Sequence, residues 1–211
     1  NLLWRADQVE TRDNSSLDCT RCVVVLVELG DKQGYDQLRR DIIKRFAGTP
    51  DPLSAERTVK NCLLLPADGE MLSELAAFKE IAEKSIRKKP ATGISDAWRC
   101  TSSAIYEYRR EHWNQAIQWC KYSLNYDDHN NARVALVHAV LAMAYYQSGQ
   151  FDDSQVELDK SRQLIGDKFK KGLDAGDGKL GYWFDWIAAR IFLREAETSV
   201  ESQDSPLESL N

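Results

Sequence analysis

Residues 132–165 read ARVALVHAVLAMAYYQSGQFDDSQVELDKSRQLI, and this stretch decides the fold of the chain. Apolar residues recur at helical spacing from Ala132 to Tyr146 and again from Phe151 to Ile165. The segment between the two runs contains Gly149, and glycine tolerates the left-handed backbone that ends a helix. The stretch therefore predicts two helices joined by a tight turn, which is a helical hairpin.

The same pattern occurs a second time at an offset of 38 residues toward the N-terminus. At this offset small residues align with small ones and aromatic residues with aromatic ones, as expected for an internal repeat. The aligned pairs include Ala104 with Ala142, Tyr108 with Tyr146, Trp113 with Phe151, Ala116 with Ser154, Cys120 with Leu158 and Ser123 with Ser161. Small side chains allow antiparallel helices to approach closely. Ala104 with Ala116, and Ala142 with Ser154, are therefore the predicted contact points.

Weaker forms of the pattern precede these two copies, so we predict an all-α superhelix of about four helical hairpins with a capping helix at its open end. The predicted hairpins span residues 17–46, 52–89, 96–126 and 132–165, and the capping helix spans residues 180–196. In the second hairpin, residues 55–65 form the first helix, because Pro52 and Pro66 suit the start and the stop of a helix, and residues 79–90 form the end of the second helix. The domain covers residues 1–196, and the acidic tail at residues 197–211 is predicted to be disordered.

The hairpin pattern resembles the tetratricopeptide repeat (TPR), in which a small residue and an aromatic of the first helix precede an aromatic and a small residue of the second. Gly149-Gln150-Phe151, together with Ala142 and Tyr146, is the closest match. The earlier copy departs from the family at two positions. Glu111 replaces the turn glycine, and Asp128 stands where the family prefers proline.

The resemblance extends over most of the chain. The segments at residues 29–35, 61–66 and 183–196 look like the C-terminal tetratricopeptide region of large serine/threonine kinases and beta-propeller proteins of planctomycete-like bacteria. This resemblance implies a regulatory or scaffolding context in the cytoplasm. The chain begins at Asn1 without an initiator methionine, so we interpret it as a fragment or a processed piece. No kinase motif is present, and any kinase activity of such a parent would lie outside this piece.

The composition of the chain argues against nucleic acid and membranes as partners. The formal net charge of −5 provides no basic surface for nucleic acid or for an anionic membrane. The longest apolar run, Cys22 to Leu29, is far shorter than the roughly 20 residues that span a bilayer. The five cysteines form an odd, scattered set, which favours a reducing compartment such as the cytoplasm.

Three features resemble reactive or ligand-binding motifs. Cys19 and Cys22 form a CxxC pair, but a structural zinc needs about four ligands, so core packing is the prediction. The glycine-rich segment 172–178 lacks the ordered residues of a phosphate or calcium loop and is predicted to be a mobile linker. The histidines, at positions 112, 129 and 138, lack metal-site spacing. We therefore predict no enzyme activity, no catalytic residue, no metal and no cofactor.

The predicted function is non-catalytic binding of a protein or peptide on the concave side of the superhelix, which the first helix of each hairpin lines. By analogy with the family, the predicted contact residues are Thr20, Arg21, Val24, Thr101, Ile105, Tyr108, Arg109, Ala139, Met143 and Tyr146. The Lys, Asn and Arg residues with which some family members clamp a peptide carboxylate are absent at the matching positions. A groove carrying Ile105 and Met143 should instead favour an apolar or aromatic anchor, with Arg109 as a carboxylate contact.

Two alternatives remain at this point. Tyr108 and Tyr146 are equally compatible with packing between neighbouring repeats. The whole chain is also compatible with a structural spacer or a homo-oligomerisation module that uses Trp183, Phe184 and Trp186 against a second copy.

Overall fold

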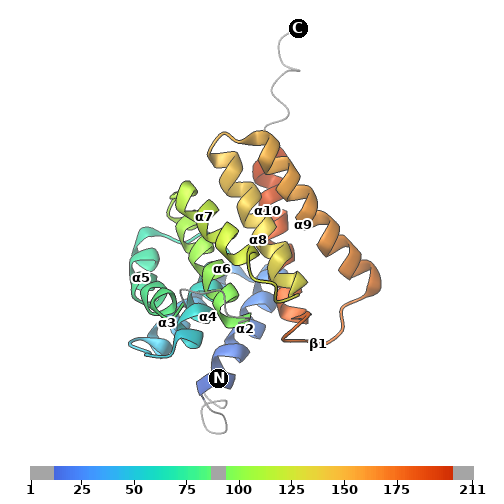
Figure 1. The fold of residues 1–211 in the computed structure, drawn as a ribbon. Coiled ribbons are helices and arrows are strands. Elements are labelled where there is room, and N and C mark those ends of the chain that lie inside the picture. Colours follow the sequence, from blue (N-terminus) through green and yellow to red (C-terminus); the bar gives the residue numbers. More distant parts are fainter. Residues whose placement is uncertain (1–11, 87–93, 202–211) are drawn as a thin grey trace.

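The computed structural model describes residues 12–86 and 94–201, and it confirms an all-α fold for that part of the chain. Within these residues, nine α-helices pack mostly against their neighbours in sequence (Figure 1). The helices are α2 (Arg12–Glu28), α3 (Lys32–Phe46), α4 (Pro52–Cys62), α5 (Gly69–Lys84), α6 (Ile94–Arg109), α7 (Trp113–Leu124), α8 (Asn131–Gln147), α9 (Phe151–Lys171) and α10 (Trp183–Glu201). None of the described helices is long and apolar enough to cross a membrane.

Consecutive helices pair as α2 with α3, α4 with α5, α6 with α7 and α8 with α9, whereas α10 packs on both α8 and α9. The start of the second helix of the second pair was not predicted. It lies at Gly69, where the Asp68 carboxylate caps the helix by accepting a hydrogen bond from the Met71 backbone N–H at 2.9 Å. One predicted boundary is wrong. Helix α10 continues past Ala196 to Glu201. The predicted tail beyond residue 201 and residues 87–90 of the predicted α5 lie outside the described residues.

The small residues predicted at the helix contacts are buried. Ala104, Ala116, Ala142 and Ser154 have exposed fractions of 1% or less. The Ser154 hydroxyl also donates a hydrogen bond to the Ala142 carbonyl oxygen at 2.8 Å, which joins α9 directly to α8. A bulkier side chain at Ser154 would displace the two helices from each other.

The contacts of the α6–α7 pair recur in the α8–α9 pair at the predicted offset. The Ser123 hydroxyl donates to the Ala97 carbonyl oxygen at 3.0 Å, and the Ser161 hydroxyl donates to the Ala135 carbonyl oxygen at 2.9 Å. A hydroxyl that bonds the backbone of the partner helix fixes the register of that pair. The two pairs therefore share the same hydrogen bond, from a serine hydroxyl to the backbone of the partner helix, at corresponding positions.

An aromatic contact at the turn is repeated in the same way. The ring centres of Tyr108 and Trp113 lie 5.3 Å apart, and those of Tyr146 and Phe151 lie 5.2 Å apart. Tilted or edge-on ring pairs at this separation are favourable. Each tyrosine thus packs on the aromatic residue that opens the second helix of its own pair.

Three of the turns between paired helices share the same backbone conformation and hydrogen bond. Gly30, Glu111 and Gly149 adopt positive φ angles of 72°, 62° and 75°, and the N–H of the next residue donates to the carbonyl five positions earlier. This arrangement satisfies the last carbonyls of the first helix and reverses the chain. Glu111 adopts the conformation without the freedom of glycine, at a cost of roughly 1–2 kcal/mol. The turn is thus retained where the glycine of the family pattern is missing.

The first helices of the pairs, α2, α4, α6 and α8, pack each against the next and form the inner layer. Helix α10 joins this layer beside α8 and also contacts α2. The Glu28 carboxylate of α2 accepts a hydrogen bond from Arg190 of α10 at 2.7 Å and forms an ion pair with Arg194. The first and last described inner helices therefore adjoin, and side chains fill the inner face.

The segment before α10 contains a small β-hairpin, so the prediction of a mobile linker is wrong for that part. Strands β1 (Gly176–Asp177) and β2 (Gly181–Tyr182) pair antiparallel. Gly181 has a φ of +96°, and a Cβ atom there would lie 2.5 Å from the Ala132 Cβ. Glycine is required at this position because the hairpin presses against the start of α8.

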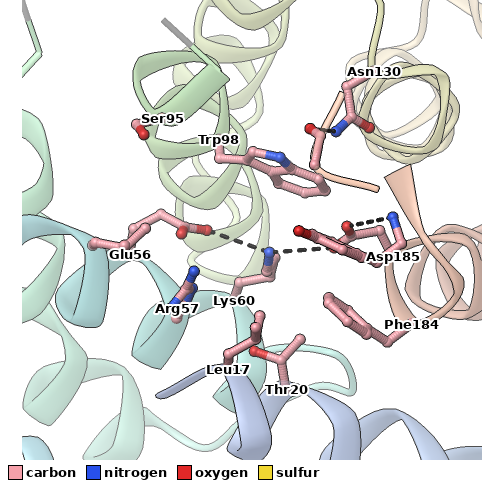
Figure 2. Close-up of a pocket in the computed structure, with 13 residues that line it drawn as sticks. Leu17, Thr20, Glu56, Arg57, Lys60, Ser95, Trp98, Asn130, Phe184 and Asp185 are labelled. Atoms are coloured by element: carbon pink, nitrogen blue, oxygen red, sulfur yellow. Dashed lines mark hydrogen bonds and ion pairs between the residues drawn. The ribbon is translucent and has the colours of Figure 1, made fainter. Parts of the chain in front are cut away.

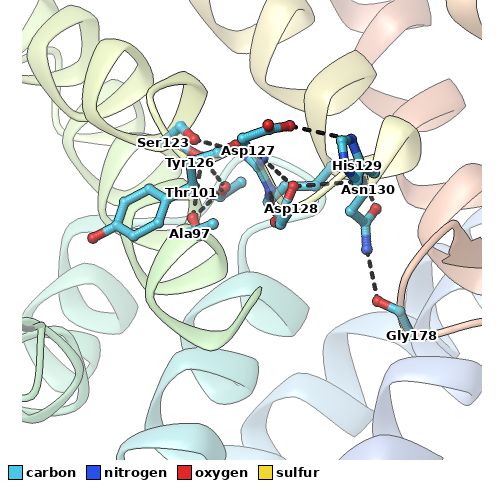
Figure 3. Close-up of polar contacts among 10 residues, drawn as sticks. Ala97, Thr101, Ser123, Tyr126, Asp127, Asp128, His129, Asn130 and Gly178 are labelled. Atoms are coloured by element: carbon cyan, nitrogen blue, oxygen red, sulfur yellow. Dashed lines mark hydrogen bonds and ion pairs between the residues drawn. The ribbon is translucent and has the colours of Figure 1, made fainter. Parts of the chain in front are cut away.

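A buried arginine, Arg133, holds the segment between α7 and α8, and Figure 3 shows polar contacts of that segment. Arg133 is fully buried, and its Nε and Nη2 atoms donate to the two carboxylate oxygens of Asp128 at 2.9 and 2.7 Å. Its Nη1 atom donates to the Ser123 carbonyl oxygen at 2.8 Å. Asn130 caps α8 and donates from Nδ2 to the Gly178 carbonyl oxygen at 3.3 Å. These contacts position Asn130 and the hairpin beside the inner helices.

Candidate functional site

Most of the predicted contact residues are buried in this structure. The buried ones are Thr20, Val24, Thr101, Ile105, Tyr108, Ala139 and Met143. Arg109 and Tyr146 are partly buried, and only Arg21 is exposed. Their role in partner binding stays a prediction. A partner that approaches this conformation of the chain reaches few of these side chains.

Helix α10 covers Arg109, the predicted carboxylate contact. The Arg109 guanidinium donates to a Glu195 carboxylate oxygen at 2.7 Å and to the Leu63 carbonyl oxygen at 3.2 Å. It also lies 5.4 Å from the centre of the Phe192 ring. The arginine that we predicted to bind a partner's carboxylate is therefore paired with a carboxylate of its own chain.

The aromatic residues assigned to self-association are also largely covered. Phe184 is 2% exposed and Trp186 is 5% exposed, whereas Trp183 is half-buried. Lys168 lies 6.0 Å from the centre of the Trp186 ring. These rings belong mainly to the packing of α10 and offer little surface to a second copy.

A cavity lies between the inner helices, and we call it the central pocket (Figure 2). Its volume is about 250 Å³. Residues from α2, α4, α6 and α10, the residue before α8 and the β-hairpin line it. Its lining includes Thr20, Glu56, Lys60, Trp98, Asn130 and Asp185.

The pocket lies where several inner helices begin. Glu56 is in the second turn of α4, Trp98 is near the start of α6, Asn130 caps α8, and Asp185 is in the first turn of α10. Helix N-termini carry partial positive charge, which stabilises acidic side chains nearby. Asp185 also accepts a hydrogen bond from the Tyr182 backbone N–H at 3.2 Å. The helix N-termini thus help to stabilise the two carboxylates, Glu56 and Asp185, at this end of the inner layer.

Three buried charges meet in the pocket and form what we call the charge triad: Glu56, Lys60 and Asp185 (Figure 2). The Lys60 Nζ atom lies 3.6 Å from Glu56 Oε1 and 3.8 Å from Asp185 Oδ1. It also lies 3.8 Å from the centre of the Trp98 ring, a cation–π contact. All three side chains are more than nine-tenths buried. Both ion contacts are longer than ordinary hydrogen bonds, so space remains beside the ammonium group.

The surroundings perturb one member of the charge triad. Burial raises the pKa of Asp185, and the nearby Lys60 ammonium offsets only part of that effect. Burial disfavours the charged form of a carboxyl because it removes water. Glu56 Oε1 accepts no hydrogen bond from the described residues. The pocket therefore contains a carboxyl group, Asp185, whose charged form is disfavoured, and a carboxylate oxygen of Glu56 that accepts no hydrogen bond from the described residues.

The rim of the pocket is more accessible. Ser95 is exposed, and Arg57 is half-buried with its Nη1 atom donating to the Ser16 hydroxyl at 2.8 Å. Thr20 lines the pocket, and the guanidinium of the exposed Arg21 lies 5.8 Å from the centre of the Phe184 ring, which forms part of the wall. Two predicted contact residues are thus at or beside this pocket.

The other candidate motifs do not join the site. Cys19 is buried and Cys22 is exposed, although both lie on α2. His112 pairs with Glu107 and His138 with Glu157, each through Nδ1. Within residues 12–86 and 94–201, no group of three or more His, Cys, Asp or Glu side chains is placed to hold a metal ion.

The charge triad escaped sequence analysis because its members are distant in sequence. Glu56 and Lys60 are four positions apart on α4, but Asp185 comes from α10. One signal was present: Asp185 interrupts the apolar run Trp183-Phe184-Asp185-Trp186-Ile187. A charge inside such a run indicates a buried partner.

Comparisons with family models, with curated proteins and with solved structures found no match to this chain.

Proposed function

We propose that this chain is a non-catalytic protein-interaction module of the tetratricopeptide type, part of a larger bacterial regulatory protein in the cytoplasm. The repeated hydroxyl contacts of Ser123 and Ser161, at the same offset as the sequence repeat, are the observation that carries this proposal. The matching aromatic pairs and turns support it as well. Stacked helical hairpins commonly serve as binding surfaces.

Within this proposal, the partner contacts the mouth of the central pocket. Side chains of α2, α4, α6 and α10 line this pocket, and Ser95 on its rim is exposed. A volume of about 250 Å³ suits one anchoring side chain better than a whole peptide. Interfaces often depend on a few such anchors seated in pockets. Arg21 and Ser95 would then contact the flanking part of the partner segment.

The spacer or homo-oligomer alternative receives less support. It depended on Trp183, Phe184 and Trp186, and two of these side chains are almost fully buried. No comparable aromatic cluster stands out on α10 for a second copy to contact.

A capture experiment tests the proposal. The chain is used as bait in lysate in three forms: unchanged, Ser95→Trp and Lys44→Trp. Ser95 and Lys44 are both exposed, so each tryptophan should leave the fold intact, but only Ser95 lines the pocket. We expect the unchanged chain and Lys44→Trp to capture the same partner, and Ser95→Trp to lose at least about 90% of it, as expected when an anchor worth over 1.4 kcal/mol is blocked.

Equal capture by all three forms would reject the pocket as the contact site. Charged residues at Ile105 and Met143 would be uninformative, because both side chains are completely buried. Buried unpaired charges would unfold the chain, so binding would be lost through unfolding and not through the loss of a partner contact.

A further inference from the structure

We infer that the central pocket recognises an uncharged primary amide, namely the side chain of a glutamine on the partner. This inference rests on the proposed function, because it names the anchor that enters the pocket. It follows from the hydrogen-bonding groups, the charges and the aromatic walls of the pocket.

The pocket contains a hydrogen-bond acceptor without a donor. Glu56 is 2% exposed, lines the pocket and has an Oε1 atom that accepts no hydrogen bond within the described part of the chain. Figure 2 shows its carboxylate directed toward Lys60 in the pocket. A buried acceptor without a donor is unfavourable. A ligand that donates an N–H to Oε1 would remove this penalty.

The pocket also contains a hydrogen-bond donor whose N–H groups are not all used. The Lys60 ammonium has three N–H groups, and its nearest carboxylate oxygens are 3.6 and 3.8 Å away. A ligand oxygen at normal hydrogen-bond distance would therefore be its closest partner. Because Glu56 and Lys60 adjoin, the ligand needs a donor and an acceptor close together.

The charged side chains around the pocket balance one another. Glu56 and Asp185 supply two negative charges around the pocket, and Lys60 and Arg57 supply two positive ones. A charged ligand would add an uncompensated charge to a buried site, which is costly. A neutral group that both donates and accepts is preferred, and a primary amide has this character.

The aromatic walls of the pocket and the length of the side chain favour glutamine. Trp98 and Phe184 both line the pocket, and a flat amide can stack on such rings. The glutamine side chain has one methylene more than asparagine and reaches further past the rim. A free amino acid would carry an ammonium and a carboxylate into the same charge-balanced space, so the side chain of a protein is the expected source.

The test is a titration of the full chain with four probes, observed through the indole N–H signal of Trp98 in NMR spectra. The probes are N-acetyl-L-glutamine N-methylamide, the corresponding glutamate and methionine compounds, and free L-glutamine. We expect the capped glutamine to bind with a Kd on the order of 1 mM, which is typical of a ligand of this size. The other three should bind at least about tenfold more weakly.

Two variants locate the binding. Ser95→Trp should abolish the titration and Lys44→Trp should leave it unchanged, since both positions are exposed and only Ser95 lines the pocket. Glu56→Leu, which removes the acceptor, should weaken binding at least about tenfold. If this last variant fails to fold, the Ser95→Trp result still decides whether the probe occupies the pocket.

The outcomes separate the two proposals. If capture depends on Ser95 but the glutamate or methionine probe binds as well as the glutamine probe, the amide assignment is overturned while the interaction module stands. If free glutamine binds more tightly than its capped form, the protein source is overturned. If the capped glutamine binds in the pocket but capture is unaffected by Ser95→Trp, the pocket is not the partner site and the proposed function fails there.

Discussion

Replacing Arg133 with methionine is expected to lower the free energy of unfolding by about 3–5 kcal/mol. The guanidinium is 0% exposed and pairs with the Asp128 carboxylate, which is itself buried. Methionine would leave that carboxylate without a cation and would remove the donors to the Ser123 and Tyr126 carbonyl oxygens. For a chain of this size, the melting temperature should fall by on the order of 10 °C. Thermal and urea unfolding measure both quantities.

The control is Arg40→Met on α3, where the side chain is exposed. This change should alter stability by less than about 0.5 kcal/mol. Adding Asp128→Asn to Arg133→Met should recover part of the loss, because the unpaired charge is removed. An Arg133→Met variant as stable as the Arg40→Met variant would show that the arginine is not buried and paired as described.

Replacing Lys60 with methionine is expected to have the next largest effect, a loss of roughly 3 kcal/mol at neutral pH. Methionine has a similar length, so the pocket would keep its shape while Glu56 and Asp185 lost the cation between them. The contact with the Trp98 ring would also lose its charge. Urea unfolding at pH 7.5 gives the size of the effect, with Lys44→Met as the exposed counterpart.

The loss in Lys60→Met should depend on pH. Burial raises the pKa of Asp185 in the folded chain above its ordinary value, and Lys60 opposes that rise. A carboxyl with a raised folded pKa contributes most stability below its unfolded pKa, and the contribution is lost as the pH rises through the folded pKa. Removing Lys60 raises the folded pKa further. The stability difference from the unchanged chain should therefore shrink as the pH falls from 7.5 toward 5.

A neutral triad provides the matched control. Combining Lys60→Met with Glu56→Gln and Asp185→Asn removes all three charges at once and should recover much of the lost stability. It should also abolish the pH dependence that Lys60→Met introduces. A loss that is the same at both pH values, or that the triple variant does not repair, would contradict a charge triad in the pocket.

Local features of the fold followed from the sequence because neighbours in the chain determine them. Gly149 and the helical spacing on either side of it indicated a hairpin, and the structure has a turn there with positive φ. The aligned serines at 123 and 161 marked corresponding positions, although their hydrogen bonds to the partner helix were not foreseen. The start of α5 was missed because its cap, Asp68, precedes a stretch with a weak apolar pattern.

The accessibility of the predicted contact residues could not be read from the sequence, because it depends on how the inner helices curve. Glu28 and Arg190 lie at opposite ends of the described chain, and only the structure pairs them. Helix α10 packs on α8 and contacts α2, and Ile105 and Met143 are completely buried in this arrangement. The charge triad likewise joins α4 to α10 through a long-range contact. Patterns of spacing within one helix contain no information about such pairs.

The most direct test of the account is photo-crosslinking of the captured partner from single positions on the chain. A benzoyl-phenylalanine is placed at Ser95 on the rim of the central pocket in one form and at Lys44 on α3 in another. We expect the partner to crosslink from position 95 and not from position 44. Crosslinks from position 44 alone, or of equal yield from both positions, would contradict partner binding at the central pocket.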